Sequence, residues 1–200
     1  IAIAEKHGVR LLVDETYRDM FKDERLPVAA SLSKKVISIS SLSKTYGIPG
    51  IRIGWAVCQD KEMIELLTCA KEQVCIGGSV VDEYIGYVAL SQKKEWIAEN
   101  DALIAGRFAI VKEWVANEEF IEWVEPRAAC TCFPRIKESA GVDVEKFYKI
   151  MNDKYGTYIG PGHWFGFDDR YMRIGYAWPL EDELRAGLAG ISAAIREARK

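Results

Sequence analysis

The sequence lacks the features that define several large classes of protein. No apolar run approaches the roughly 18 residues that a transmembrane helix needs, and stretches such as residues 53–58 end after the length of one strand. A signal peptide is not expected, because Glu5, Lys6 and His7 interrupt the first residues. Lysine and arginine number 27 against 30 acidic residues, which leaves a net charge of −3. This balance indicates no nucleic-acid or membrane partner, and we expect a cytoplasmic protein.

Metal-binding and disulfide patterns are also missing. The chain has five cysteines and two histidines and no CxxC pair, so we expect neither a zinc site nor any other metal site. Secreted disulfide scaffolds are smaller and denser in cysteine than this chain. We therefore expect buried, reduced thiols at Cys58, Cys69, Cys75, Cys130 and Cys132.

Two common nucleotide-binding motifs fail on inspection. Lys44 and Thr45 follow an expected strand, but Ser43 and Ser38 stand where a P-loop requires glycine. Residues 47–54 read GIPGIRIG and do not match the dinucleotide pattern G-x-G-x-x-G. The lysine therefore needs a different explanation from phosphate binding by a P-loop.

What is present is an ordinary globular composition, 49% hydrophobic and 28% charged. Apolar or alternating runs at residues 9–13, 36–40 and 51–58 predict strands, and the first leads directly into Asp14, as buried parallel strands often do. Helices are expected over residues 61–71 and from Ser79 onward, where Asp82 completes a capping pattern. The expected fold class of this half is α/β, with a three-layer, mostly parallel sheet.

The second half begins with one long helical pattern over residues 93–117. Its apolar positions recur on a single face, at Ile97, Ile104, Phe108, Val111 and Val115. Strands are then expected over 120–124, 131–136 and 171–176, and helices over 143–155 and from Pro179 onward. The last helix should bury Leu184, Leu188, Ile191 and Ile195. This half therefore predicts a smaller α+β unit joined to the first by the long helix.

Reactive side chains follow two of the expected strands. Asp14 and Tyr17 lie after the first strand, and Lys44 lies after the second, with Arg52 further along the chain. Ligands gather at the carboxyl ends of strands in open α/β sheets. A lysine able to form a Schiff base, an aspartate to keep a pyridine nitrogen protonated, and serines with an arginine to hold a phosphate are what pyridoxal phosphate requires.

The sequence around these residues resembles a known family. Residues 13–17 read VDETY and residues 41–55 read SLSKTYGIPGIRIGW, and both segments are similar to signatures of the class I and II aminotransferases, the fold type I pyridoxal-phosphate enzymes. The step of eight residues from Lys44 to Arg52 matches that family. Residues 171–176 (YMRIGY), preceded by the glycines of 160–166, resemble a third family segment.

The resemblance implies a role for each matching residue. Lys44 would bind the cofactor and act as general base and acid, while Asp14 and Tyr17 would contact the cofactor ring. The phosphate would be held by Ser41, Ser43 and Arg52. Arg173 would bind the substrate carboxylate, and its place on an interior strand makes an unpaired charge there costly. Glu15 is expected to be structural, and His163 and Trp164 to serve packing.

The same resemblance implies an enzyme that moves an amino group between an α-amino acid and a 2-oxo acid, and a homodimer. We expect residues 1–95 to belong to a large cofactor-binding domain, 96–117 to be a connecting helix and 118–200 to form a small domain. Because the chain opens without methionine inside a helical pattern, we expect a piece of a longer protein. Two alternatives remain open: another pyridoxal-phosphate reaction (β-elimination, decarboxylation or cyclisation), or an inactive fragment of such an enzyme.

Overall fold

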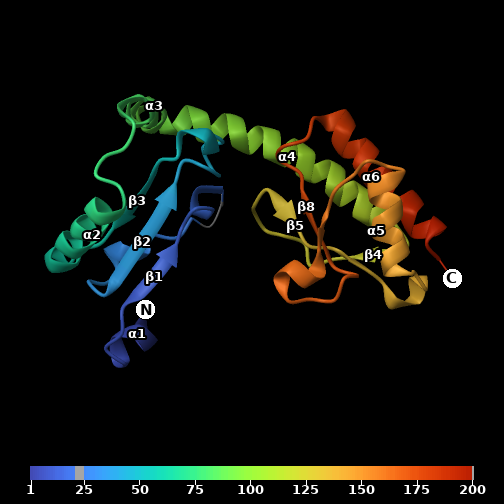
Figure 1. Cartoon of the computed structure of the whole chain (residues 1–200), viewed down its shortest axis with the longest axis horizontal. Helices are drawn as coiled ribbons and strands as arrows, with labels where there is room; N and C mark the ends of the chain where they lie inside the picture. Colours follow the sequence, from blue (N-terminus) through green and yellow to red (C-terminus); the bar gives the residue numbers. More distant parts are fainter. Residues whose placement is uncertain (21–24, 200) are drawn as a thin grey trace. The chain divides into compact units, whose positions relative to one another are not determined.

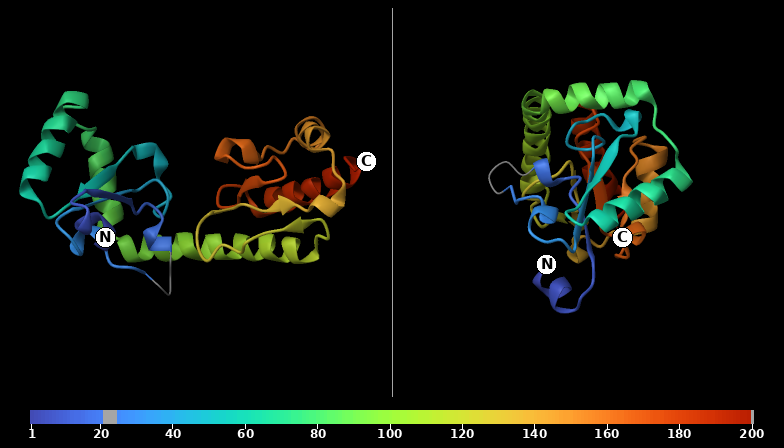
Figure 2. Two further views of the ribbon diagram at one scale, coloured as in Figure 1. Left: turned by 90° about the horizontal axis from the view of Figure 1, so that it is seen from below. Right: turned by 90° about the vertical axis from the view of Figure 1, so that its left-hand side faces the viewer.

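The computed structural model describes residues 1–20 and 25–199. The chain divides into two compact units, Ile1–Asp101 and Ala102–Lys200. Each unit has a sheet and helices, shown in sequence colours in Figure 1. The division falls inside the long helix α4 (Lys93–Asn117), which is one unbroken helix with the predicted bounds (Figure 2).

The sheet of the first unit has three strands, β1 (Leu11–Asp14), β2 (Val36–Ser41) and β3 (Gly54–Val57). β1 pairs with β2 in parallel, with Asp14 opposite Ile39, as expected. β3 was expected to be of parallel type, but it pairs with β2 in the antiparallel sense. Only turns and the short η3 (Pro49–Ile51) connect β2 to β3, whereas a parallel neighbour requires a longer crossover, usually a helix.

Three α-helices precede α4 in the described part of this unit. α1 (Ala2–Lys6) is followed after one residue by Gly8, whose φ of +67° is the left-handed conformation expected of a helix stop. α2 (Lys61–Val74) is capped by the Asp60 carboxylate, which accepts hydrogen bonds from two backbone amides. α3 (Val80–Ser91) begins after Ser79, whose hydroxyl accepts from the Asp82 amide at 3.3 Å. The start of α3 confirms the cap predicted at Ser79.

The buried apolar core of the first unit is small. The cluster found among the described residues consists of Leu42, Tyr46 and Ile97, with four partly buried neighbours, and a few further apolar side chains such as Met20 and Val36 are buried outside it. A side chain at Gly86 of α3 would begin 3.3 Å from the Leu42 side chain, so α3 packs closely over the segment that follows β2. By contrast, none of the described residues of α2 is buried.

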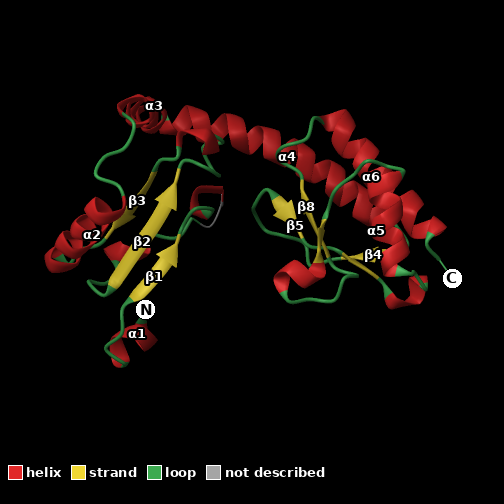
Figure 3. Ribbon diagram, in the orientation of Figure 1, coloured by secondary structure: helices red, strands yellow, loops and turns green. Residues whose placement is uncertain are grey.

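The second unit contains two small sheets, visible as the short strands of Figure 3. β4 (Ile121–Glu122) pairs with β6 (Arg135–Ile136), and β8 (Met172–Gly175) lies between β5 (Thr131–Cys132) and β7 (Gly160–Pro161). The single strand expected over 131–136 is therefore wrong. Pro134 interrupts it because proline has no N–H for a ladder, and the two halves join different sheets.

The core of the second unit is formed by α4, by α5 (Val144–Asp153), by α6 (Glu181–Glu197) and by the strands. Asp143 caps α5 by accepting from the Lys146 amide at 3.1 Å. All four predicted positions on α6 are buried, as are Phe147 and Met151 on α5. Four of the five predicted apolar positions of α4 join this core, whereas Ile97 belongs to the core of the first unit.

A tight loop joins β7 to β8. It contains the short helix η5 (Gly162–Phe165), and the Phe167 amide donates to the Gly162 carbonyl at 3.0 Å. A Cβ atom at Gly162 would lie only 2.0 Å from the backbone carbonyl oxygen of Asp168. The loop therefore requires glycine at this position.

The thiols differ from the expectation of uniform burial. All five cysteines are free, and Cys132 is buried, whereas Cys58 and Cys130 are half-buried. Cys69 and Cys75 are exposed, because α2 has no covering element among the described residues. Within residues 1–20 and 25–199, no helix has the length and apolar character needed to cross a membrane.

Candidate active site

Asp14 ends β1 with its side chain exposed and fixed by a local turn. Its Oδ1 accepts from the Thr16 amide at 2.9 Å and from the Thr16 hydroxyl at 2.6 Å. These hydrogen bonds lower the pKa of the Asp14 carboxyl below its usual value. The group is therefore an anion at neutral pH, which is the form that pairs with a protonated ring nitrogen.

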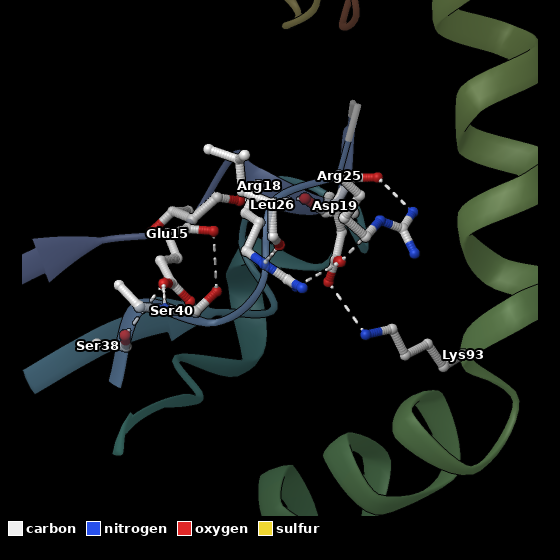
Figure 4. A network of polar contacts seen from close by, with 11 residues as sticks. Glu15, Arg18, Asp19, Arg25, Leu26, Ser38, Ser40 and Lys93 are labelled. Atoms are coloured by element: carbon white, nitrogen blue, oxygen red, sulfur yellow. Dashed lines mark hydrogen bonds and ion pairs between the residues drawn. The ribbon is translucent and has the colours of Figure 1, made fainter. Parts of the chain in front are cut away.

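Glu15, the next residue, belongs to a network of polar contacts that ties β1 to its neighbours (Figure 4). Its Oε1 accepts from the Ala29 amide at 2.6 Å and from the Ser38 hydroxyl at 3.0 Å. The Glu15 amide also donates to the Ile39 carbonyl at 2.8 Å. Glu15 therefore has the structural role that was expected, and it holds the backbone beside Asp14.

Lys44 lies on an exposed turn three residues after β2. The Gly47 amide donates to the Lys44 carbonyl at 3.0 Å and closes this turn, in which Gly47 has a φ of +69°. Within the described part of the chain, no hydrogen bond or ion pair engages the Lys44 amine. Beside it, the Ser43 amide donates to the Ser41 hydroxyl at 3.3 Å.

A direct hydrogen bond joins the segment that carries Lys44 to the segment that carries Asp14. The Thr45 hydroxyl donates to the Thr16 carbonyl at 3.1 Å, and Thr45 is buried. The Asn100 side chain of α4 donates to the Thr45 carbonyl, also at 3.1 Å. Thr45 could have been suspected from its place beside Lys44, but nothing local in the sequence pointed to Asn100.

Arg52 lies between η3 and β3 in the left-handed conformation, with a φ of +49°. One guanidinium nitrogen donates to the Pro49 carbonyl at 2.7 Å, and the side chain is otherwise exposed. Ser41, the last residue of β2, pairs with Gly54 of β3. Arg52 precedes β3, and Lys44 follows β2. Both residues therefore lie at the same end of the sheet.

Tyr17 is half-buried in the turn that leads into η1 (Arg18–Met20), where its carbonyl accepts from the Met20 amide at 3.1 Å. The structure thus brings Asp14, Lys44 and Arg52 to one end of the sheet of the first unit, with Tyr17 on the segment that follows Asp14.

Arg173 lies in the second unit, on the central strand β8. The expectation of a costly buried charge is wrong, because Met172 and Ile174 face the core and Arg173 points to the exposed face. Across the strand pair, a Cβ at Gly160 would lie 3.4 Å from the Arg173 Cβ and 3.5 Å from the Trp164 ring. Arg173 and Trp164 therefore both lie against Gly160.

The exposed guanidinium of Arg173 has no polar partner in the described residues. The neighbouring His163 does have one, since its Nδ1 lies 2.7 Å from Asp169 Oδ1.

The donor set of the first unit fits one cofactor class. An unengaged amine, an anionic carboxylate, two serines and an exposed guanidinium at one end of an α/β sheet are the groups that pyridoxal phosphate needs. An arginine with free N–H donors suits a phosphate, because the guanidinium can donate two parallel hydrogen bonds. The fold and these residues define the class as pyridoxal-phosphate enzymes.

Comparison with known proteins agrees with this class. The family model described as aminotransferase class I and II matches residues 1–191, so the chain belongs to this family. It is 33% identical over 193 residues to capreomycidine synthase from Streptomyces vinaceus, an alignment that covers 91% of this chain and 46% of that protein. The chain spans about half the length of the curated relatives it matches.

Solved structures show the same fold. A PLP-dependent aminotransferase from Streptococcus suis superposes with a TM-score of 0.90 at 30% identity, covering 100% of this chain and 52% of that one. The PLP-dependent cyclase OrfR has a TM-score of 0.85 at 27% identity, covering 97% of this chain and 52% of its own. The family and these structures indicate pyridoxal phosphate as the cofactor.

Proposed function

We propose that the protein is a pyridoxal-phosphate-dependent aminotransferase that moves an amino group between an α-amino acid and a 2-oxo acid. The observation that carries this proposal is the unengaged Lys44 amine on a turn that Thr45 ties to the Asp14 segment. When bound, the cofactor supplies an electron-accepting ring that makes the α-proton of an amino acid acidic.

Each residue has a separate task in this proposal. Lys44 would hold the cofactor through its amine, and after substrate binds it would take the proton from the substrate α-carbon and return it elsewhere. Asp14, kept ionised by Thr16, would hold the ring nitrogen in its protonated form. Tyr17 would donate a hydrogen bond from its hydroxyl to the phenolic oxygen of the cofactor.

Binding and orientation would come from other residues. Ser41, Ser43 and Arg52 would hold the phosphate, so that the ring stays in place while Lys44 moves. Arg173 would bind the α-carboxylate with two parallel hydrogen bonds. Residues 1–95 would then contribute to a large cofactor-binding domain with a three-layer sheet, 96–117 would connect the domains, and 118–200 would form the small domain of a homodimer.

Borohydride reduction tests the role of Lys44. Borohydride should fix pyridoxal phosphate covalently to Lys44, detected as a mass increase on the peptide that contains this residue. Lys44→Ala should abolish this attachment, whereas Lys35→Ala, which removes a lysine that donates only to the Gly8 carbonyl, should leave it intact. Attachment that persists at another single lysine in Lys44→Ala would refute the assignment.

Cyclisation is the second candidate reaction. It is supported by the relatives, which include a cyclase of known structure and a synthase that is 33% identical. The residues assigned above would support cyclisation as well as transamination, since both begin with removal of the α-proton. Product analysis separates the two reactions. A single turnover with an amino acid should release the corresponding 2-oxo acid if the protein is an aminotransferase, and a cyclised amino acid if it is a cyclase.

A further inference from the structure

One carboxylate in the first unit is contacted by three cations. Asp19, in η1, has a side chain that is 13% exposed. Its Oδ1 lies 3.0 Å from an Arg18 nitrogen and 3.4 Å from Arg25 Nε, and its Oδ2 lies 3.1 Å from Lys93 Nζ (Figure 4). Enclosure in this way strengthens the ion pairs relative to those of fully exposed side chains.

The two arginines make local hydrogen bonds, to residues close to them in the sequence. Arg18 Nε donates to the Leu26 carbonyl at 2.8 Å, and Arg25 donates to the Asp19 carbonyl at 3.1 Å. Lys93 is different, because it is the first residue of α4 and comes from far along the chain. The Asp19–Lys93 pair is therefore the contact in this network that ties the segment after β1 to α4.

The same helix also holds the segment that follows β2. The Asn100 side chain donates to the Thr45 carbonyl at 3.1 Å, and Ile97 packs with the buried Tyr46 in one apolar cluster. Burial raises the pKa of the Tyr46 phenol, and the nearby Lys93 charge opposes that shift. Lys93 thus ties α4 to a residue two positions after Tyr17, and Asn100 ties it to the residue after Lys44.

We propose that Lys93 is a positioning residue for the cofactor site: its ion pair with Asp19 holds the Tyr17 segment against α4, which the hydrogen bond from Asn100 to Thr45 joins to the Lys44 segment. This inference rests on the proposed function, in which both segments contact the cofactor. Asp14 has its own anchor, because Glu15 and the β1–β2 ladder hold it independently of Lys93. The Lys44 segment keeps the Asn100 contact, so loss of Lys93 should loosen the Tyr17 segment and spare the other two.

Hydrogen exchange measures this pattern without cofactor. In Lys93→Met, the Met20 amide, which donates to the Tyr17 carbonyl, should exchange at least tenfold faster. The Glu15 amide, which donates to the Ile39 carbonyl, and the Gly47 amide, which donates to the Lys44 carbonyl, should exchange at the wild-type rate. Unchanged exchange at Met20 would overturn the proposal.

Cofactor titration gives the second readout. The apparent Kd for pyridoxal phosphate, followed by absorbance, should rise at least fivefold in Lys93→Met and return towards wild type in Lys93→Arg, which keeps the charge. Lys94→Met, a neighbouring exposed lysine, is the matched control and should behave as wild type. Faster exchange with an unchanged Kd would show a merely structural role and would also overturn the proposal.

Two further points keep the test decisive. If Lys93→Met does not fold, Lys93→Gln retains a hydrogen-bond donor without the charge, and the same exchange and Kd changes are expected in it. Covalent attachment at Lys44 is first measured in the wild type. Its absence there would refute the proposed function, whereas its presence together with a wild-type-like Lys93→Met would refute this inference alone.

Discussion

The two units of the chain differ in the kind of contact that stabilises each of them internally. In the described residues of the second unit, one cluster of 19 buried side chains joins α4, α5, α6 and the strands. The corresponding cluster in the described first unit has three members. Its site segments are tied instead by polar contacts at Glu15, Asp19 and Thr45. A directional polar contact fixes the position of a particular side chain, whereas apolar packing mainly supplies stability.

Two leucines of matched type provide the largest test of this contrast. Leu188 on α6 is 3% exposed, whereas Leu66 on α2 is 61% exposed. Leu188→Ala should lower the free energy of unfolding by about 2–5 kcal/mol, because it removes buried methyl groups and leaves a cavity. Leu66→Ala should change it by less than about 0.5 kcal/mol. Urea unfolding of the 200-residue chain, followed by circular dichroism, measures both. Equal losses at the two positions would mean that another surface covers α2.

Arg173 separates function from stability in the densely packed unit. Because the Arg173 guanidinium is exposed and makes no ion pair among the described residues, Arg173→Leu should leave the free energy of unfolding nearly unchanged. It should raise the KM for α-carboxylate substrates by at least tenfold, since breaking a bidentate carboxylate pair in a site typically costs about 2–5 kcal/mol.

Two variants serve as comparisons for Arg173→Leu. Arg173→Lys should fall between wild type and Arg173→Leu, because lysine keeps the charge but loses the paired donors. Arg185→Leu removes an exposed arginine of α6 that pairs with Glu181, and should not change KM. A wild-type KM in Arg173→Leu would remove Arg173 from the substrate site.

The cysteines give the smallest and most local test. Cys69 and Cys75 in the first unit are exposed, whereas Cys132 in the second is buried. A thiol-specific reagent at pH 8 should modify Cys69 and Cys75 in the native protein and reach Cys132 only after unfolding, as peptide mass spectrometry would show. Rapid native modification of Cys132 would show that the second core opens readily.

The Cys132 thiol also predicts a pH dependence. Burial raises the pKa of Cys132 to about 12. In the unfolded chain the thiol ionises near its ordinary value, so between about pH 9 and 12 the unfolded state binds fewer protons than the folded state. Stability should therefore fall as the pH rises through this range. Cys132→Ala should reduce that slope, which urea unfolding at several pH values would measure.

Local sequence signals predicted many helices and strands. They failed where contacts between residues far apart in the sequence determine strand pairing or burial. The bounds of α4 and the apolar face of α6 follow from helical periodicity, which depends on near neighbours alone. The antiparallel direction of β3 and the break at Pro134 depend on which strand each segment pairs with. The exposure of Cys69 and Cys75 could not be predicted either, because an amphipathic pattern does not reveal whether a partner covers the helix.

The candidate site divides in the same way. Asp14, Lys44 and Arg52 were predicted because each lies in a short motif at a strand end. The hydrogen bond from Thr45 to Thr16 and the ion pair between Asp19 and Lys93 join residues far apart in sequence. No spacing rule connects such residues, so only the folded arrangement could identify them.

The contact at Gly162 limits how the loop before Arg173 can diverge among related sequences. With the Asp168 carbonyl only 2.0 Å from where a Cβ would lie, any replacement must move the backbone. The neighbouring Trp164 ring is more than half exposed and carries no such restriction. Replacement of Trp164 would therefore change the surface beside Arg173 without moving the loop, whereas replacement of Gly162 would displace the backbone of the loop itself.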